Sequence, residues 1–227
     1  MTWRQLTDDV ALISFPWRVL GIDFRRNVTL LRLPDGRVVI HSTAPFTEHD
    51  ISAIRRFGKP SWLVEATLMH DTFAKEGRKA LPNIPYLAPE GFAKATEVPT
   101  ESLLPPPREW DGEIDVLRID GVRMNEAALF HRRSRTLVVA DLFFSFPRET
   151  SGWPRFFVRH IMRLPRLFGI SALYRFLVIR DKEAFARSMR ALLALDFDRL
   201  VVAHSEPIET DAKRAAEQAL RDSQLLP

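Results

Sequence analysis

The stretches TLVVAD (residues 136–141) and LVVAH (residues 200–204) share one pattern. Each is a short apolar run rich in β-branched residues, which is typical of a buried strand. Each then ends in a side chain that can bind a metal ion, Asp141 in the first and His204 in the second. Because the carboxyl ends of buried strands are where sites are built in α/β sheets, the two stretches predict both a fold class and the position of a site.

A third apolar run, Trp62–Val64, leads within a few residues to His70. His70, Asp141 and His204 are therefore candidate metal ligands. Asp and His are also common turn residues, so the same positions are compatible with hydrogen bonds that only tether loops.

The composition of the chain excludes several classes of protein. With 227 residues, 46% of them apolar, the chain can bury a large core, and we expect a single domain over residues 1–227. Its 33 Lys and Arg against 29 Asp and Glu give a net charge of +4, too small a surplus to predict nucleic-acid binding. It has no cysteine, so any metal must be bound by His, carboxylate, amide or water.

The sequence also lacks targeting segments and two common catalytic motifs. Its first residues include Asp8 and Asp9 and contain no continuous apolar run behind a basic start, unlike a signal peptide. No stretch has the roughly 18 apolar residues of a membrane-spanning helix, so we expect a soluble, cytoplasmic protein. Because it has no Gly-x-Ser-x-Gly elbow, we expect no serine hydrolase chemistry. It has no glycine-rich phosphate loop either.

Residue patterns predict strands and helices in both halves. Residues 27–42 predict a hairpin around Pro34-Asp35-Gly36, and residues 125–141 predict a second hairpin that resembles it, a hint of internal duplication. Thr47 can cap a helix over 48–56. The other predicted elements are strands over 10–15, 61–65, 86–88, 114–119 and 199–203, and helices over 72–79, 181–195 and 210–221.

Strands with interleaved helices in both halves predict a layered α/β (α+β) fold. We expect half-domains at about 1–98 and 108–227, joined by the proline-rich connector Pro99–Pro107, which can continue neither helix nor strand. A helical insertion is expected at about 147–180.

With these hairpins and strand-end residues, the chain resembles the metallo-β-lactamase fold superfamily, specifically a divergent branch of unknown function with a degenerate metal-binding motif. The resemblance covers most of the chain and is most specific at the block of residues 125–131 and 134–141 and at residues 201–204. It implies a four-layer αββα sandwich with one or two metal ions at one edge of the paired sheets. It also implies that Asp141 takes the place of the carboxylate that bridges two metals, and His204 that of the late histidine.

The signature loop of that superfamily is Thr-His-x-His-x-Asp-His, whereas residues 67–73 read TLMHDTF. At most one of its histidines, His70, is present. If Thr67 aligns with the threonine of the motif, His70 belongs to the first metal site. If His70 takes the closing position, it groups with Asp141 and His204 around one ion. We favour this second register, because it yields a two-histidine, one-carboxylate ligand set.

Two carboxylates complete the predicted site. The histidine that the resemblance implies before the second hairpin is missing, and nearby Glu126 is a candidate substitute ligand or an acceptor that orients a ring nitrogen. Alternatively, Glu126 forms only an ion pair with Arg123 or a hydrogen bond with a backbone amide. Asp71 is the nearest candidate for a catalytic base, with helix capping as its structural alternative. We expect one divalent ion, zinc, iron or manganese, or none.

Two functions are compatible with these residues. The first is a mononuclear metal-dependent hydrolase, in which the ion activates water to attack an ester, thioester, amide or phosphoester of a small molecule. The second is a metal-free, non-catalytic relative that acts as a binding or interaction module. We favour the enzyme because three metal-ligand side chains lie beyond strand ends.

Residues 153–180 form a basic aromatic segment without acidic residues. Three roles compete for it: a lid that recognises an acidic substrate, a surface for peripheral contact with anionic lipid, or an interface with a partner or second subunit. The structural alternative is an insertion whose aromatic residues fill the core. We favour a lid, because the segment directly follows the Asp141 loop. Its arginines are Arg155, Arg159, Arg163, Arg166, Arg175 and Arg180.

Overall fold

Strands and helices alternate along residues 1–225, the part of the chain that the computed structural model describes. The strands are β1 (Thr2–Thr7), β2 (Val10–Phe15), β3 (Arg18–Val19), β4 (Ile22–Asp23), β5 (Arg26–Arg32), β6 (Arg37–His41), β7 (Lys59–Val64), β8 (Tyr86–Ala88), β9 (Glu101–Ser102), β10 (Ile114–Arg118), β11 (Ala127–His131), β12 (Thr136–Val139), β13 (Phe144–Ser145), β14 (Phe168–Gly169) and β15 (Arg199–Val202). The helices are α1 (Glu48–Phe57), α2 (Ala74–Ala80), α3 (Phe92–Thr96), α4 (Gly152–Phe156), α5 (Ala172–Leu177), α6 (Lys182–Ala194) and α7 (Ala212–Asp222), with a 3-10 turn at Arg108–Trp110 and a π-helical turn at Phe157–Ile161.

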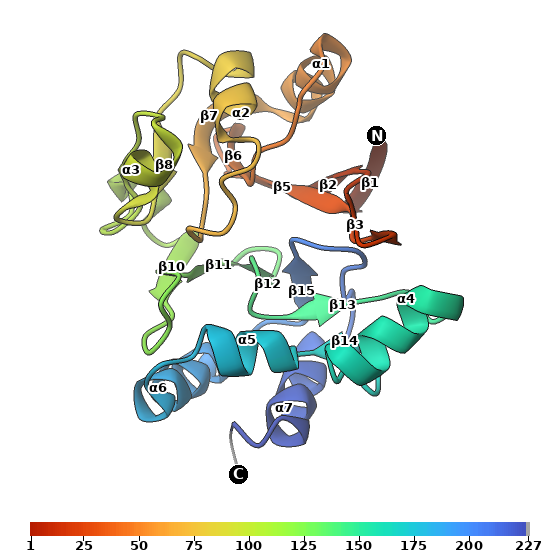
Figure 1. The fold of residues 1–227 in the computed structure, drawn as a ribbon. Coiled ribbons are helices and arrows are strands. Elements are labelled where there is room, and N and C mark those ends of the chain that lie inside the picture. Colours follow the sequence, from red (N-terminus) through yellow and green to blue (C-terminus); the bar gives the residue numbers. More distant parts are fainter. Residues whose placement is uncertain (226–227) are drawn as a thin grey trace.

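Two β-sheets packed face to face form the centre of the protein (Figure 1). The first has the order β1-β2-β5-β6-β7-β8-β9 and the second the order β10-β11-β12-β15. Helices α1, α2 and α3 pack on the outer face of the first sheet, and α5, α6 and α7 on that of the second. The expected four-layer αββα sandwich is therefore confirmed.

Alternation within the strands builds the core between the sheets. Leu12 and Leu31 face inward from the first sheet, and Leu129 and Val201 face them from the second. Trp110 is fully buried in this layer and meets the ring of Trp62 edge to face, with ring centroids 5.8 Å apart. The residues between these inward-facing positions pack instead against the outer helices, as the period of two in a strand requires.

Most predicted elements agree with the structure. Both hairpins form, with Leu31 opposite Val39 in the first and Leu129 opposite Val138 in the second, and they lie in different sheets. Thr47 caps α1: its hydroxyl accepts a bond from the Asp50 amide, and the Asp50 carboxylate accepts one from the Thr47 amide at 2.8 Å. This reciprocal pair is a capping box.

The structure also contains short strands that the sequence did not predict. β1 is an edge strand whose residues are all exposed or half-buried, so it has no apolar pattern to detect. β9 lies within the proline-rich connector, and the ribbons β3–β4 and β13–β14 pair over two residues in each strand. No helix within residues 1–225 is long and apolar enough to cross a membrane.

The topology fixes the edge at which the strand ends meet. β12 and β15 are parallel neighbours with Val139 opposite Val202, so the two residues that follow each strand also lie side by side. The loop after β7 crosses to the second sheet, where the Ala127 amide donates to the Ala66 carbonyl at 2.8 Å. The loops after β7, β12 and β15 are thereby held together at this edge.

Asn27 links the two sheets at the same edge. Its fully buried side chain donates to the carbonyls of Val202 and Ser205 at 2.9 and 2.8 Å, on either side of His204. Its backbone amide donates to the Ala203 carbonyl, also at 2.8 Å, and the Ser14 hydroxyl donates to its amide oxygen at 2.6 Å. The position of the His204 loop therefore depends on one side chain from the first sheet.

We predict that Asn27→Ala lowers the free energy of unfolding by about 2–4 kcal/mol, because two buried carbonyls lose their donor. Urea denaturation followed by circular dichroism measures this. The matched control is Asn83→Ala, at an exposed turn residue with no side-chain hydrogen bond among the described residues, and its effect should stay within about 0.5 kcal/mol. Equal effects of the two variants would contradict the linking role of Asn27.

Candidate metal centre

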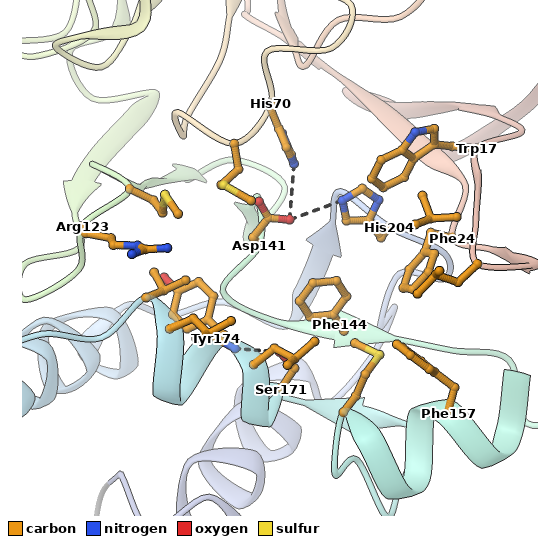
Figure 2. Close-up of a pocket in the computed structure, with 18 residues that line it drawn as sticks. Trp17, Phe24, His70, Arg123, Asp141, Phe144, Phe157, Ser171, Tyr174 and His204 are labelled. Atoms are coloured by element: carbon orange, nitrogen blue, oxygen red, sulfur yellow. Dashed lines mark hydrogen bonds and ion pairs between the residues drawn. The ribbon is translucent and has the colours of Figure 1, made fainter. Parts of the chain in front are cut away.

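The structure brings His70, Asp141 and His204 together, with one ligand atom of each within 4.8 Å of the others. The Asp141 carboxylate lies between the two rings (Figure 2). Its Oδ1 is 3.4 Å from Nε2 of His70 and 3.3 Å from Nε2 of His204. Asp141 and His204 meet because they follow the paired strands β12 and β15, and His70 reaches them from the loop after β7.

The orientation of His204 is fixed on several sides. Its Nδ1 lies 2.9 Å from the carbonyl of Arg25, and because a carbonyl only accepts, Nδ1 must hold a proton. Trp17 and Phe144 stack on the ring, with centroid distances of 4.9 and 5.8 Å. Burial lowers the pKa of His204, so the ring favours the neutral form and its Nε2 presents a lone pair to Asp141.

His70 is oriented in the same way by a buried carboxylate. Its Nδ1 lies 3.4 Å from the Ser42 hydroxyl and 3.6 Å from Glu65 Oε2, and Glu65 in turn accepts from the amide and hydroxyl of Thr43 at 2.7 and 2.5 Å. Arg26 lies 3.5 Å from the same carboxylate. Burial opposes the charged form of His70, but Asp141 and Glu65 outweigh it and raise its pKa. Carboxylates that hold the outer nitrogen of a histidine ligand are common in metal sites.

The donor set fits a divalent metal ion. The His70 Nε2 is buried without a hydrogen-bond partner, and Nε2 of His204 faces the same carboxylate oxygen. A neutral His70 with its proton on Nδ1 would, like His204, direct a ring lone pair at this anionic oxygen, and that arrangement is repulsive unless a cation lies among the three groups. Two imidazole nitrogens and a carboxylate suit zinc, iron or manganese. Burial raises the pKa of Asp141, but the two histidines outweigh it and hold that pKa well below the ordinary value, so the carboxylate is charged.

Glu126 lies beside this cluster and does not join it. Its Oε1 accepts from the amides of Asp141 and Leu142 at 3.0 and 2.9 Å, and its Oε2 accepts from the Tyr174 hydroxyl at 2.8 Å. Burial, with a further contribution from the Asp141 charge, raises the pKa of Glu126 to about 7. Glu126 thus fixes the backbone of the Asp141 loop. This agrees with the expected alternative of a backbone-amide partner and differs from the expected ligand or acceptor for a ring nitrogen.

Asp71 is not in position to act as a base at this cluster. Its side chain is exposed and does not line the cavity above the three ligands, although it follows His70 in the sequence. It does not cap a helix either, since α2 begins at Ala74 with Phe73 at the capping position.

A cavity of about 420 Å³ opens above the three ligands. Its polar side chains, apart from the ligands, are those of Arg123, Ser171 and Tyr174. The Tyr174 hydroxyl is already bonded to Glu126. The apolar wall consists of Trp17, Val19, Leu20, Phe24, Met69, Met124, Phe144, Phe157, Met162, Leu173, Leu177 and Val178. The site is therefore polar at its base and apolar along its walls.

Much of the wall comes from the basic aromatic segment. Phe157 and Met162, from the π-helical turn and the residue after it, line one side, and Leu173 and Leu177 of α5 line another. Phe157, Val158 and Met162 also pack with Ile22 and Phe24 in a small separate core. Residues 153–180 thus overhang the cluster, in the place we expected for a lid.

Sequence reasoning missed the residues that hold the ligands in place. Glu65 directly follows the apolar run Trp62–Val64, so it showed the same strand-end signal as Asp141 and His204 and was overlooked. Arg26, Asn27 and Tyr174 had no comparable signal. His41, at the end of β6, is fully buried and faces the charges of Glu65 and His70, and burial lowers its pKa to about 3. His131 bonds to Ser134 at the opposite end of the second sheet.

Comparisons of the whole structure identify the architecture. A metallo-β-lactamase from Erythrobacter litoralis superposes with a TM-score of 0.66 at 16% identity, covering 99% of this chain and 96% of its own. The mono-zinc form of the metallo-β-lactamase FIM-1 from Pseudomonas aeruginosa superposes with a TM-score of 0.63 at 11% identity, covering 100% of this chain and 96% of its own. A metallo-β-lactamase from Pontibacter korlensis superposes with a TM-score of 0.63 at 10% identity, covering 98% of this chain and 96% of its own.

The chain has the metallo-β-lactamase fold. The likeness extends over 99–100% of this chain and 96% of each of these two structures. No protein-family model matches the sequence, and no curated protein matches it. At 10–16% identity the solved structures establish the fold alone.

We predict that Glu126→Ala lowers the free energy of unfolding by about 2–5 kcal/mol, because three buried donors lose their acceptor. Tyr174→Phe removes only one of these bonds and should cost about 1–2 kcal/mol. Glu126→Gln retains an acceptor oxygen for the two amides, so it should lie between the wild type and Glu126→Ala. Urea denaturation measures the order of the four free energies of unfolding. A Glu126→Ala variant as stable as the wild type would refute the role of Glu126 in holding the Asp141 loop.

Proposed function

We propose that the protein is a metal-dependent hydrolase that binds one divalent ion through His70, Asp141 and His204. The observation that supports this most is the convergence of two oriented ring nitrogens on a half-buried carboxylate at the base of a cavity. The fold supports it too, since a neighbour of the same fold, FIM-1, has a form with a single zinc.

Such an ion, when bound, acts as a Lewis acid and lowers the pKa of water, which yields a nucleophile near neutral pH. The chain supplies the orientation: the Arg25 carbonyl and Glu65 fix the two rings, and Glu126 fixes the loop of Asp141. Arg123, at the cavity wall, is positioned to bind an anionic group of the substrate.

The walls favour a substrate with a large apolar part. A cavity of about 420 Å³ with mainly aromatic and aliphatic lining can take an acyl chain or ring system, with the scissile bond at the polar base. Among the ester, thioester, amide and phosphoester bonds considered above, the carbonyl compounds suit this lining better. A phosphoester brings more negative charge, and Arg123 is the only cationic side chain among the lining residues.

We predict that protein purified without chelator contains about one equivalent of zinc, iron or manganese, and that the stripped protein binds zinc again. His204→Asn should weaken zinc binding by more than about 100-fold, beyond the effect typical of outer partners of a ligand. Metal analysis and zinc titration measure both. His49→Gln, at an exposed position on α1, should leave zinc binding unchanged.

Less than about a tenth of an equivalent of metal, together with no zinc binding by the stripped protein, would refute the metal centre. That outcome would favour the second hypothesis, a metal-free interaction module that uses residues 153–180. Equal loss of binding in the His204 and His49 variants would show that zinc binds to surface histidines instead.

We predict that the zinc-loaded protein hydrolyses thioesters and aryl esters faster as the acyl chain lengthens. Each methylene that enters the cavity should raise kcat/KM by about two- to fourfold, the equivalent of its burial free energy. A series of substrates from acetyl to dodecanoyl measures this, with His204→Asn as the inactive control. Rates that do not depend on chain length would show that the apolar wall does not bind the acyl part.

A further inference from the structure

Exposed apolar side chains gather around the cavity. Apart from Met1, every exposed large apolar residue of the described chain either lines the cavity or lies within four residues of one that does. Leu20 and Phe176 are 68% and 69% exposed. Exposed apolar side chains gathered in this way are uncommon on a soluble monomer and mark a surface that binds a partner. We call it the mouth surface: Val19, Leu20, Met69, Trp153, Phe156, Ile161, Leu173, Phe176 and Leu177.

The mouth surface brings together parts of the chain that lie far apart in the sequence. The Trp153 indole donates to the carbonyl of Leu20 at 3.0 Å, which connects α4 to the hairpin β3–β4. Trp153 and Phe156 stack with centroids 5.9 Å apart. Leu173 and Leu177 contribute to the surface from α5 while also lining the cavity, so the cavity opens within the mouth surface.

The charges of residues 153–180 have one sign. No acidic residue occurs between Glu149 and Asp181, and Arg159 and Arg163 are exposed without a carboxylate partner among the described residues. Of the six arginines there, Arg166 forms an ion pair, with Asp222 at 3.0 Å. Apolar side chains interspersed with arginines are typical of surfaces that enter the interface of an anionic bilayer. A second copy of this face would bring the same arginines against each other.

We propose that the mouth surface docks on an anionic phospholipid bilayer, so that the cavity opens toward the lipid acyl chains. Leu20 and Phe176 would enter the headgroup region, and Arg159 and Arg163 would contact lipid phosphates and carboxylates. This docking does not depend on the metal centre, and a protein without metal would dock in the same way. It would also explain how an apolar substrate reaches the cavity without passing through water.

The test is flotation of the full-length protein with vesicles of phosphatidylcholine alone, or with about one third phosphatidylserine. We expect binding to the anionic vesicles, weaker binding to phosphatidylcholine, and a decrease with salt. Arg159→Gln/Arg163→Gln should weaken binding to anionic vesicles by about tenfold or more. The control Arg55→Gln/Arg56→Gln removes the same charge from exposed positions on α1 and should change binding by less than about twofold.

A second variant tests the apolar contribution. Leu20→Asn/Phe176→Gln should weaken binding to both kinds of vesicle, with unchanged circular dichroism and urea midpoint; Asn suits the positive φ of 52° at position 20. Trp153 fluorescence should shift to shorter wavelength on vesicle binding.

Three results would overturn the proposal. The first is no flotation of the wild type with anionic vesicles, and the second is an equal loss of vesicle binding in the Arg159/Arg163 and Arg55/Arg56 variants. The third is that the wild type forms a dimer that does not float with vesicles and that the Leu20→Asn/Phe176→Gln substitutions dissociate. The last would show that a second copy covers the surface.

Discussion

Two carboxylates at one edge of the sandwich, that of the fully buried Glu65 and that of the half-buried Asp141, determine what the surrounding chain must supply. A buried carboxylate is stable only with hydrogen-bond donors or positive charge around it. Arg26 and Thr43 meet that need at Glu65. At Asp141 the groups in reach are two histidine rings, each oriented from outside by an acceptor. One positive charge from Arg26 cannot balance two carboxylates, so a cation, a proton on His70 or a metal ion, completes the arrangement.

Much of the fold could be predicted because its signals are local. The apolar runs that end at Asp141 and His204 became the parallel strands β12 and β15, and their register alone makes the two residues neighbours. The capping of α1 by Thr47 needed only four consecutive residues. Edge strand β1 could not be predicted, because a strand that is not buried needs no alternation.

The site was less predictable, because its geometry depends on contacts across the sheets. Asp71 follows His70 in the chain but its side chain is exposed, since neighbours in a loop need not face the same way. Glu126 was noticed as a carboxylate, yet its partners are the amides of residues 141 and 142, which only the folded chain brings near. Arg26 acts on Glu65, 39 positions away, and Asn27 acts on Ser205, 178 positions away, and no pattern of spacing shows that.

The two parts of the site have different origins in the fold. The ligands extend from strand ends that backbone hydrogen bonds fix in both sheets, whereas most of the wall belongs to residues 153–180 and the hairpin β3–β4. These wall segments contact each other through their own small core and the bond between Trp153 and Leu20. A change at a wall residue of these segments that contacts neither a ligand nor Glu126, such as Leu173 or Leu177, therefore leaves the ligand geometry intact. In an evolving or engineered lineage, the substrate range could therefore change through substitutions within residues 153–180, while the three metal ligands stay the same.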